Sequence, residues 1–364
     1  MNVLVVNPFG IGDVLFTTPI VRALAENGHA VYFWSNERVA DILKYNPAIK
    51  GLLPLSRGDL KRVFKASAGK GVKSFLAMMK RIRGSRFDMA LDFSMDYRYS
   101  LILWLLGVKK RIGFDYKGRG CFLTDMIKID GFTDKYIAEH YAGILKIVDK
   151  SFEAGGKMEL FIGEDDNKWA ERFLKENGIA AGDVVVGIAP GGGASWGGDA
   201  FRKHWPKENF ASVADKLIEE CGNKVIIFGN QNESMLCEAL AKKMKHISIN
   251  TGGMLSLGQF AALLKRCKLL ITNDGGPLHM AVALGVKTVS IFGPVDEKVY
   301  GPYPPSRDHI AIAGTVDCRP CYKNFRYPLC KNMICLESIN PSEVLDAVRK
   351  VLNDNTRSRN AVSA

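Results

Sequence analysis

The stretch that most constrains the fold runs from residue 268 to residue 294. An apolar run, Leu269–Ile271, predicts a buried strand, and Asn273-Asp274-Gly275-Gly276 ends it. Pro277 suits the first turn of a helix, where its missing N–H is not needed. Val286–Phe292 then predicts a second buried strand. Together these elements predict a parallel β-α-β unit, and such sheets bind ligands outside the carboxyl ends of their strands.

The same plan recurs along the chain. Val3–Val6 predicts a strand before a glycine-rich turn, and Val184–Ile188 predicts another before Pro190-Gly191-Gly192-Gly193. Strand and helix patterns alternate in two runs, with a break near residues 155–165. We therefore expect an α/β protein with two Rossmann-like, doubly wound domains facing a central cleft. The expected boundaries are 1–160 for the first domain, 161–340 for the second, and 341–364 for a C-terminal helix and tail.

The charge of the chain indicates anionic partners. The formal net charge is +12, which favours phosphorylated ligands, nucleic acid or an anionic membrane surface. Ten Lys and Arg residues lie in the stretch 57–86, which is expected to be helical over 58–86, and only Asp59 opposes them. A second basic cluster follows between Lys109 and Arg119. Either cluster alone fits a solvated face, whereas together they predict an anionic substrate or membrane surface at the N-terminal half. No recognised nucleic-acid module is present, which counts against nucleic acid.

Several common sites and segments are absent from the sequence. Leu15 and Trp196 stand where a third glycine would complete G-x-G-x-x-G, which argues against an NAD enzyme. There is no P-loop and no Asp-x-Asp pair for magnesium. No apolar run reaches about 18 residues, so no transmembrane helix is expected. The N-terminus reads as a strand rather than a signal peptide, so a cytoplasmic location is expected.

Four segments in order resemble glycosyltransferase family 9, the lipopolysaccharide heptosyltransferases and their relatives. They are Gly12-Asp13-Val14 with Pro19, Arg202-Lys203-His204-Trp205-Pro206, Gly229 through Glu233, and Asn273 through His279 with Phe292-Gly293-Pro294. The resemblance covers nearly the whole chain. It implies a GT-B fold, an inverting mechanism and no required metal. It also implies that the domain 1–160 lies on the acceptor side and that the domain 161–340 binds the nucleotide sugar.

The resemblance also implies roles for individual residues. Asp13 looks like the general base and Lys203 like the cation that neutralises the departing diphosphate. The other implied donor contacts are a ribose acceptor, Glu233, a phosphate contact, Ser195, and a diphosphate and sugar site at Asp274, Gly275, Gly276 and His279. Structural alternatives remain open. Asp13 and Asp274 suit helix caps, Lys203 and Glu233 suit solvated charges, and His279 suits a packed surface residue.

The implied reaction is transfer of a heptose from ADP-heptose to the lipid A–inner core acceptor in lipopolysaccharide biosynthesis. The expected partners are a nucleotide-sugar donor, an anionic lipid-linked saccharide and the inner-membrane surface, with the enzyme peripheral on its cytoplasmic face. The alternatives are a GT-B-type nucleotide-sugar epimerase and a family 9 transferase that uses another sugar donor. A non-catalytic binding protein is a further alternative, against which the retention of both Asp13 and Lys203 argues.

Four cysteines cluster near the C-terminus, with the pattern Cys318-x2-Cys321-x8-Cys330-x4-Cys335. Four thiolates in a cytoplasmic protein can hold a structural zinc ion, although the x8 spacing is not that of a standard finger. The sequence leaves a structural zinc site and reduced free thiols as the two hypotheses.

Overall fold

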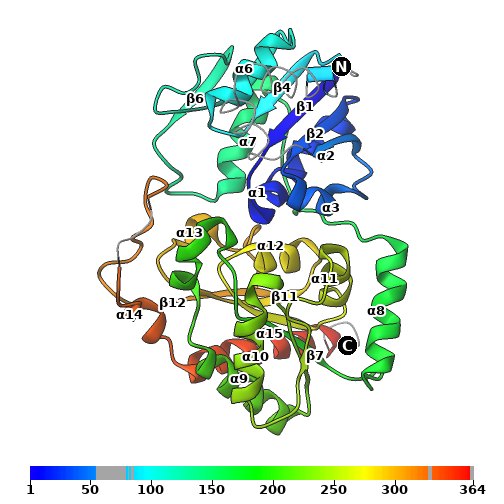
Figure 1. Ribbon diagram of the computed structural model, residues 1–364, viewed down its shortest axis with the longest axis vertical. Helices are drawn as coiled ribbons and strands as arrows, with labels where there is room; N and C mark the ends of the chain where they lie inside the picture. Colours follow the sequence, from blue (N-terminus) through cyan, green and yellow to red (C-terminus); the bar gives the residue numbers. More distant parts are fainter. Residues whose placement is uncertain (55–78, 81, 83–85, 327–329, 361–364) are drawn as a thin grey trace, which may run out of the picture. The chain divides into compact units, whose positions relative to one another are not determined.

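The computed structural model describes residues 1–54, 79–80, 82, 86–326 and 330–360, with 353–360 described by their backbone alone. The chain forms two compact units, Met1–Phe161 and Ile162–Ala364. Each is an α/β unit with one six-stranded parallel sheet (Figure 1). Because parallel sheets join their strands by crossover helices, both faces are covered and the strands are rich in buried Val, Leu and Ile.

The first unit has the strand order β3-β2-β1-β4-β5-β6. Its elements are β1 (Asn2–Asn7), α1 (Ile11–Phe16), α2 (Thr18–Glu26), β2 (Ala30–Ser35), the 3-10 helix η1 (Glu37–Val39), α3 (Ala40–Leu43), β3 (Ile49–Pro54), β4 (Met89–Asp92), α6 (Tyr97–Leu105), β5 (Lys110–Tyr116), β6 (Asp125–Ile129) and α7 (Ile137–Val148). The order reverses between β1 and β4, where Val6 pairs with Asp92. Ligands in doubly wound sheets bind outside the carboxyl ends of the strands at such a reversal.

The predicted basic helix over 58–86 lies largely outside the described residues, although the described Met79, Lys80 and Ile82 within it are helical. Met79 and Ile82 pack in a core cluster that includes Leu103 and Val108. The helix expected after the first glycine-rich turn is divided at Thr17, whose hydroxyl donates to the carbonyl of Val14 at 2.6 Å.

The second unit repeats the topology, with the strand order β12-β11-β10-β7-β8-β9 and its reversal between β7 and β10. Its elements are α8 (Glu164–Glu176), β7 (Val185–Ala189), the 3-10 helix η2 (Ala194–Lys203), α9 (Lys207–Cys221), β8 (Lys224–Ile227), the 3-10 helix η3 (Gln231–Glu233), α10 (Ser234–Lys243), β9 (Ile249–Asn250), α11 (Leu257–Leu264), β10 (Leu269–Asn273), α12 (Gly276–Ala283), β11 (Lys287–Phe292), α13 (Glu297–Tyr300), β12 (His309–Ala313), α14 (Ile334–Glu337) and α15 (Pro341–Asn360).

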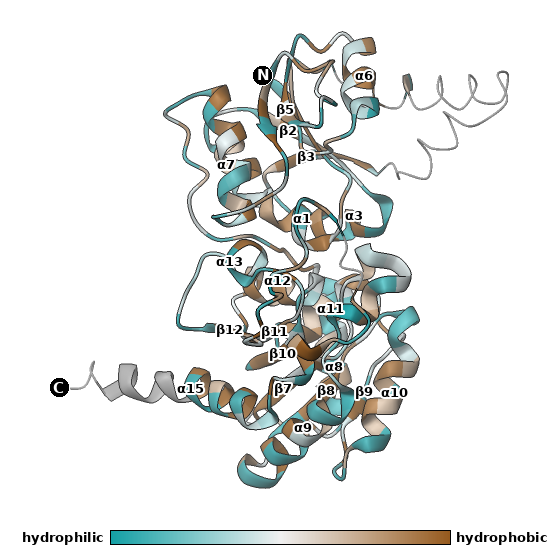
Figure 2. Cartoon of the chain, turned by 90° about the vertical axis from the view of Figure 1, so that its left-hand side faces the viewer, coloured by the Kyte–Doolittle hydropathy of each residue, from teal (hydrophilic) through white to brown (hydrophobic). Residues whose placement is uncertain are grey.

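A hydrophobic core in the second unit packs the flanking helices α9 and α15 against the sheet. On α9 the side chains of Phe210, Val213 and Leu217 are buried, at the i, i+3 and i+7 spacing of a helix face. Figure 2 shows hydrophobic and hydrophilic colour on opposite sides of this helix. Val344 and Val348 of α15 join the same core cluster, so the C-terminal helix packs as part of this unit.

Candidate active site

The candidate donor site is built at the reversal between β7 and β10, where the turns that follow both strands meet. Asn273, the last residue of β10, is fully buried and ties the turns together. Its side-chain amide donates to the carbonyls of Pro190 (2.7 Å) and Gly191 (3.1 Å), and its carbonyl oxygen accepts from the backbone N–H of Trp205 (3.0 Å). A buried amide with its donors and acceptor satisfied fixes both turns in one arrangement.

Two glycines allow these turns to approach each other. Gly192 has φ of +116°, which L side chains rarely adopt, and a Cβ there would lie 3.1 Å from the carbonyl oxygen of Asp274. A Cβ on Gly275 would lie 3.2 Å from the Cα of Gly192. Gly275 is the N-cap of α12, and Gly276 is the first residue of that helix. The start of α12 therefore presents backbone N–H groups beside a glycine-rich turn, an arrangement that suits anions.

Lys203 and Asp274 form a buried ion pair at this edge, with 2.5 Å between Nζ and Oδ2 and side-chain exposures of 10% and 6%. The two residues are 71 positions apart in the sequence. The Lys203 ammonium also lies 4.5 Å from the centroid of the Trp196 ring, a cation–π distance. Neither residue is the solvated charge or simple cap that the structural alternatives described, because η2 and β10 bring both into the interior.

His279 lies on α12 and is buried. Burial lowers the pKa of His279 to about 4; Asp274 acts to raise the pKa and Lys203 to lower it. The imidazole is therefore neutral at pH 7, when it can both donate and accept a hydrogen bond. It is not the packed surface residue of the alternative reading.

Glu233 and Ser195 lie at the border of this site. The two carboxylate oxygens of Glu233 accept from the backbone N–H groups of Gly192 (2.8 Å) and Asn230 (2.9 Å). Glu233 is thus part of a capping box and also holds the turn after β7, while its oxygens keep lone pairs for a further donor. Ser195 is exposed in η2, next to the buried Trp196.

Asp13 lies in the first unit, in the first turn of α1 after β1. The N-cap of this helix is Gly10 and has no side-chain cap hydrogen bond, so Asp13 does not occupy the cap position of the alternative reading. Asn7 donates to the Asp13 backbone carbonyl at 2.9 Å, and the Tyr141 hydroxyl lies 3.5 Å from Asp13 Oδ1. Tyr141 is fully buried, with its ring centroid 4.8 Å from that of Phe93.

Asp92 ends β4 beside β1, at the reversal of the first sheet, and is a buried carboxyl that sequence reasoning missed. Burial raises the pKa of Asp92 to about 7, although Ser94 donates its backbone N–H to Oδ1 at 2.8 Å and opposes that rise. Asp13 and Asp92 therefore lie near the same edge of the sheet in the first unit.

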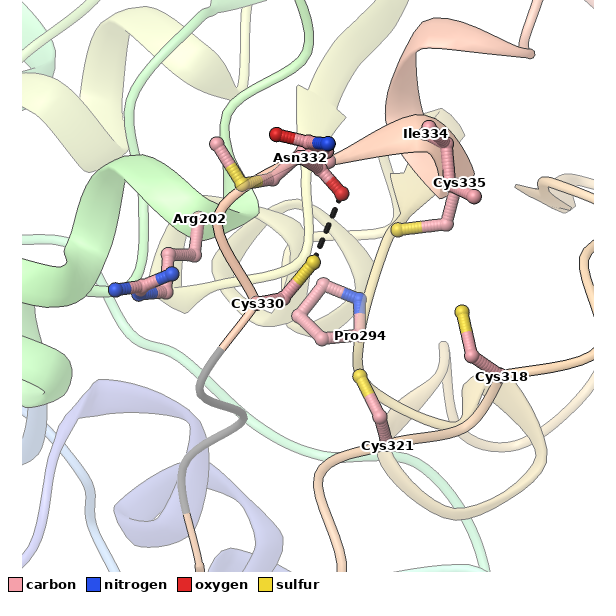
Figure 3. Close-up of a pocket in the computed structure, with 9 residues that line it drawn as sticks. Arg202, Pro294, Cys318, Cys321, Cys330, Asn332, Ile334 and Cys335 are labelled. Carbon is pink, nitrogen blue, oxygen red and sulfur yellow. Dashed lines mark hydrogen bonds between the residues drawn. The ribbon is translucent and has the colours of Figure 1, made fainter.

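The four clustered cysteines and Arg202 line one pocket in the second unit, together with Pro294, Asn332, Met333 and Ile334 (Figure 3). All four cysteines are free thiols, and the thiol of Cys330 donates to the carbonyl of Asn332 at 2.8 Å. Burial raises the pKa of Cys335 to about 11, so this thiol is protonated at pH 7. Across the described parts of the chain, no group of three or more His, Cys, Asp or Glu residues could hold a metal ion, so the zinc hypothesis gains no support.

The cysteine segment nevertheless contacts residues of the candidate donor site. The backbone N–H groups of Cys321 and Tyr322 both donate to the carbonyl of Pro294 at 3.0 Å. The Tyr322 ring lies 5.1 Å from the ring of Trp196, which in turn lies against the Lys203 ammonium. Sequence reasoning missed Trp196 and Tyr322 as neighbours of Lys203, because nothing in their spacing indicates the contact.

A family model for glycosyltransferase family 9 (heptosyltransferase) matches residues 75–328. The chain belongs to glycosyltransferase family 9. This confirms the resemblance inferred from the four sequence segments, and the protein is a glycosyltransferase.

Individual relatives have low sequence identity to this chain but match most of its length. The lipopolysaccharide heptosyltransferase 2 of Escherichia coli K12 is 24% identical over 310 residues, covering 81% of this chain and 83% of that protein. A glycosyl transferase family 9 structure from Veillonella parvula superposes with a TM-score of 0.81 at 24% identity and covers 97% of both chains. The E. coli ADP-heptose LPS heptosyltransferase II superposes with a TM-score of 0.74 at 19% identity, covering 98% of this chain and all of that one. The predicted two-domain α/β fold of GT-B type is confirmed.

Proposed function

We propose that this family 9 enzyme transfers a heptose from ADP-heptose to the lipid A–inner core acceptor of lipopolysaccharide, with inversion and without a required metal. The observation that carries the proposal is the buried Lys203–Asp274 pair beside the start of α12. The names of the relatives support the choice of sugar, since they include a lipopolysaccharide heptosyltransferase and an ADP-heptose LPS heptosyltransferase.

In the proposed reaction the acceptor hydroxyl oxygen bonds to the anomeric carbon while the bond from that carbon to the diphosphate oxygen breaks. The hydroxyl proton passes to a carboxylate, and ADP leaves with the electron pair of the broken bond. Negative charge grows on the diphosphate during the step. A fixed ammonium near it therefore stabilises the transition state more than the bound donor.

The proposed donor contacts follow from what each group can do. The backbone N–H groups at Gly275 and Gly276 suit the diphosphate, as does the exposed hydroxyl of Ser195. Lys203 provides the positive charge, held between Asp274 and the Trp196 ring. Neutral His279 suits the sugar or diphosphate oxygens, and the remaining lone pairs of Glu233 suit a ribose hydroxyl.

The proposed general base is Asp13. It is half-buried, lies in the turn after β1, and has the Tyr141 hydroxyl 3.5 Å from its carboxylate. A carboxylate in this position can take the acceptor proton during attack. We also propose that the enzyme works as a peripheral protein at the cytoplasmic face of the inner membrane, where a lipid-linked acceptor would be found. Among the described helices, none is long and apolar enough to cross a bilayer.

The proposal is tested by incubating the purified enzyme with ADP-heptose and a lipid A–inner core acceptor and following both products. The expected result is ADP release that depends on the acceptor, together with an acceptor whose mass increases by one heptose unit. A panel of other nucleotide sugars tests the donor. Conversion of a nucleotide sugar without an acceptor would instead identify an epimerase, and turnover of a different sugar alone would overturn the heptose assignment.

A further inference from the structure

The first unit exposes an apolar surface at the last turn of α6. Trp104 is 52% exposed and Leu105 is 41% exposed. The half-buried ring of Phe122 lies 6.0 Å from the ring of Trp104. We call Trp104, Leu105 and Phe122 the α6 patch. Exposed apolar residues that stand singly are ordinary, whereas a contiguous group with basic neighbours indicates a binding surface.

Hydrogen bonds from the Arg111 guanidinium fix the backbone around the α6 patch. Its Nε donates to the carbonyl of Phe122 at 2.6 Å, and its Nη1 donates to the carbonyls of Val108 and Lys109. The backbone N–H of Thr124 also donates to the carbonyl of Arg111 at 2.8 Å. These bonds join the end of α6 to the segment before β6, so a partner would meet an apolar surface that is already formed.

Basic side chains adjoin the α6 patch. Lys109 is exposed four residues after Leu105, and the half-buried Lys110 follows it. Lys80 and Arg86 are also exposed, and Met79 and Ile82 beside Lys80 pack with Leu103 and Val108 in one core cluster.

The nearby carboxylates have partners of their own. Asp88 accepts from the backbone N–H of Asn2 at 2.7 Å, and Asp125 accepts from the Thr124 hydroxyl at 2.8 Å. Asp149 accepts from Ser151 and also interacts with Lys110, and these contacts lower its pKa. These carboxylates keep their charge, but the described cations Lys80, Arg86, Lys109, Lys110 and Arg111 outnumber them, so the charge around the α6 patch is positive on balance.

We propose that the α6 patch docks the enzyme onto an anionic phospholipid bilayer, with Trp104 and Leu105 entering the boundary between headgroups and acyl chains. An indole ring prefers that boundary, since one part of it is apolar and its N–H can remain hydrated. Lysines beside it attract anionic headgroups. The inference rests on the proposed function in one respect, because a lipid-linked acceptor is what makes a membrane surface the relevant partner.

Trp104 makes the docking directly measurable. It is the only exposed one of the chain's five tryptophans, all of which are described, since Trp34, Trp196 and Trp205 are buried and Trp169 is half-buried. The full-length protein is mixed, without any sugar substrate, with vesicles of phosphatidylcholine alone or with one-third phosphatidylglycerol. We expect co-sedimentation with the anionic vesicles, a blue shift of tryptophan emission, and quenching by brominated acyl chains. High salt should weaken binding, because it screens the lysines.

Variants separate insertion from charge. Trp104→Ser combined with Leu105→Ser should reduce vesicle binding at least tenfold and remove the blue shift. Lys109→Glu should reduce binding about fivefold to thirtyfold, the effect of reversing one charge near an anionic surface. Trp104→Phe should preserve binding but lose the emission shift. The matched control is Met235→Ser on α10, a residue that is 81% exposed without being part of the patch, and it should bind as the wild type does.

The inference is overturned if the wild type does not bind anionic vesicles, or if the double serine variant binds as well as the Met235→Ser control. It is also overturned if the double serine variant only abolishes a dimer seen by light scattering, since the patch would then be a protein interface. Failure of the proposed function can be distinguished from failure of the docking inference. Turnover of a delipidated, water-soluble acceptor should be unchanged in the double serine variant, and vesicle binding requires no turnover at all.

Discussion

Lys203→Ala tests the candidate site most directly, because two separable effects are expected from one change. The variant leaves Asp274 as a buried carboxylate, 6% exposed, without its cation. Removing one partner of a buried ion pair typically costs about 3–5 kcal/mol of stability. For a unit of this size each kcal/mol corresponds to about 2–4 °C, so the melting temperature should fall by roughly 6–20 °C.

The kinetic effect of Lys203→Ala should be distinct from that loss of stability. Removing one group that stabilises the developing charge costs about 3–4 kcal/mol of activation free energy, or roughly 10²–10³ in kcat. The assay is steady-state ADP release at a temperature where differential scanning fluorimetry shows the variant to be folded. Lys203→Met combined with Asp274→Asn should recover most of the melting temperature, because no unpaired charge remains, but it should not recover kcat.

Lys287 provides a matched control. It is a second buried lysine in the same unit, and its ammonium donates to the carbonyl of Val351 at 2.5 Å. It lies at the amino end of β11, whereas the candidate site lies at the carboxyl ends of the strands. Lys287→Ala should lower the melting temperature without changing kcat. If Lys203→Ala lowered kcat no more than Lys287→Ala does, Lys203 would have no part in the chemistry.

Three further predictions concern ionisable groups. Asp13→Asn should leave the melting temperature nearly unchanged, since Asp13 does not cap α1, and should lower kcat by about 10²–10⁴, the usual share of a general base; near wild-type turnover would eliminate it. Burial raises the folded-state pKa of Asp92 to about 7 from its ordinary value of 3.8, so the folded protein retains a proton that the unfolded chain loses. Its stability should therefore decline as pH rises from about 4 to 7, by up to about 4 kcal/mol. Urea unfolding of Asp92→Asn should lack that decline, and an unchanged pH slope would contradict the assignment. Burial lowers the pKa of His279 from 6.5 to about 4, so below pH 6.5 the unfolded chain takes up a proton that the folded protein does not bind. The free energy of unfolding should therefore fall by about 3 kcal/mol as pH falls from 6.5 to 4. His279→Asn should remove this loss in the same assay.

Local patterns in the sequence predicted β1, β7 and β10, because each is a short apolar run that stops at a glycine-rich turn. The edge strands β3 and β6 are only partly buried and were not predicted. Leu269–Asn273 and Val185–Ala189 are fully buried strands close to their predicted limits. The helix after β1 was harder to predict. Its apolar spacing continues through Thr17, while the hydroxyl of that residue bonds to Val14 and Pro19 begins a new helix beside it. Periodicity alone does not register such a break.

The candidate site depended on contacts between distant segments. The resemblance to the family suggested roles for Lys203 and Asp274, but their pairing across 71 residues follows from the order of β7 and β10 in the sheet. Asn273 was part of the recognised motif but had no assigned role. In the structure its side chain hydrogen-bonds the turn after β7 and so joins that turn to the end of β10. Asp92 and Tyr141 had no sequence signal, because burial beside β1 and α1 is what distinguishes them.

The charges around Lys203 lead to a last prediction, for Asp274. The charges of Lys203 and Asp274 cancel, and His279 is neutral at pH 7. These three groups together therefore carry no net charge before the donor binds. A diphosphate brings negative charge to a place where Asp274 already has one. On the proposed function, Asp274 should therefore accept hydrogen bonds from sugar hydroxyls, while Lys203 faces the diphosphate.

Asp274→Asn should accordingly have opposite effects on ADP and on the nucleotide sugar. It removes a like charge from the diphosphate and releases Lys203 from its partner, so ADP should bind about fivefold to tenfold more tightly, the scale of one charge interaction of about 1 kcal/mol. The contact to the sugar is weakened, so turnover of the nucleotide sugar should fall. Isothermal titration with ADP and a steady-state assay measure the two effects. Weaker ADP binding in the variant would mean that Asp274 holds Lys203 in its binding position rather than opposing the diphosphate, and the assignment of Asp274 to the sugar would then be wrong.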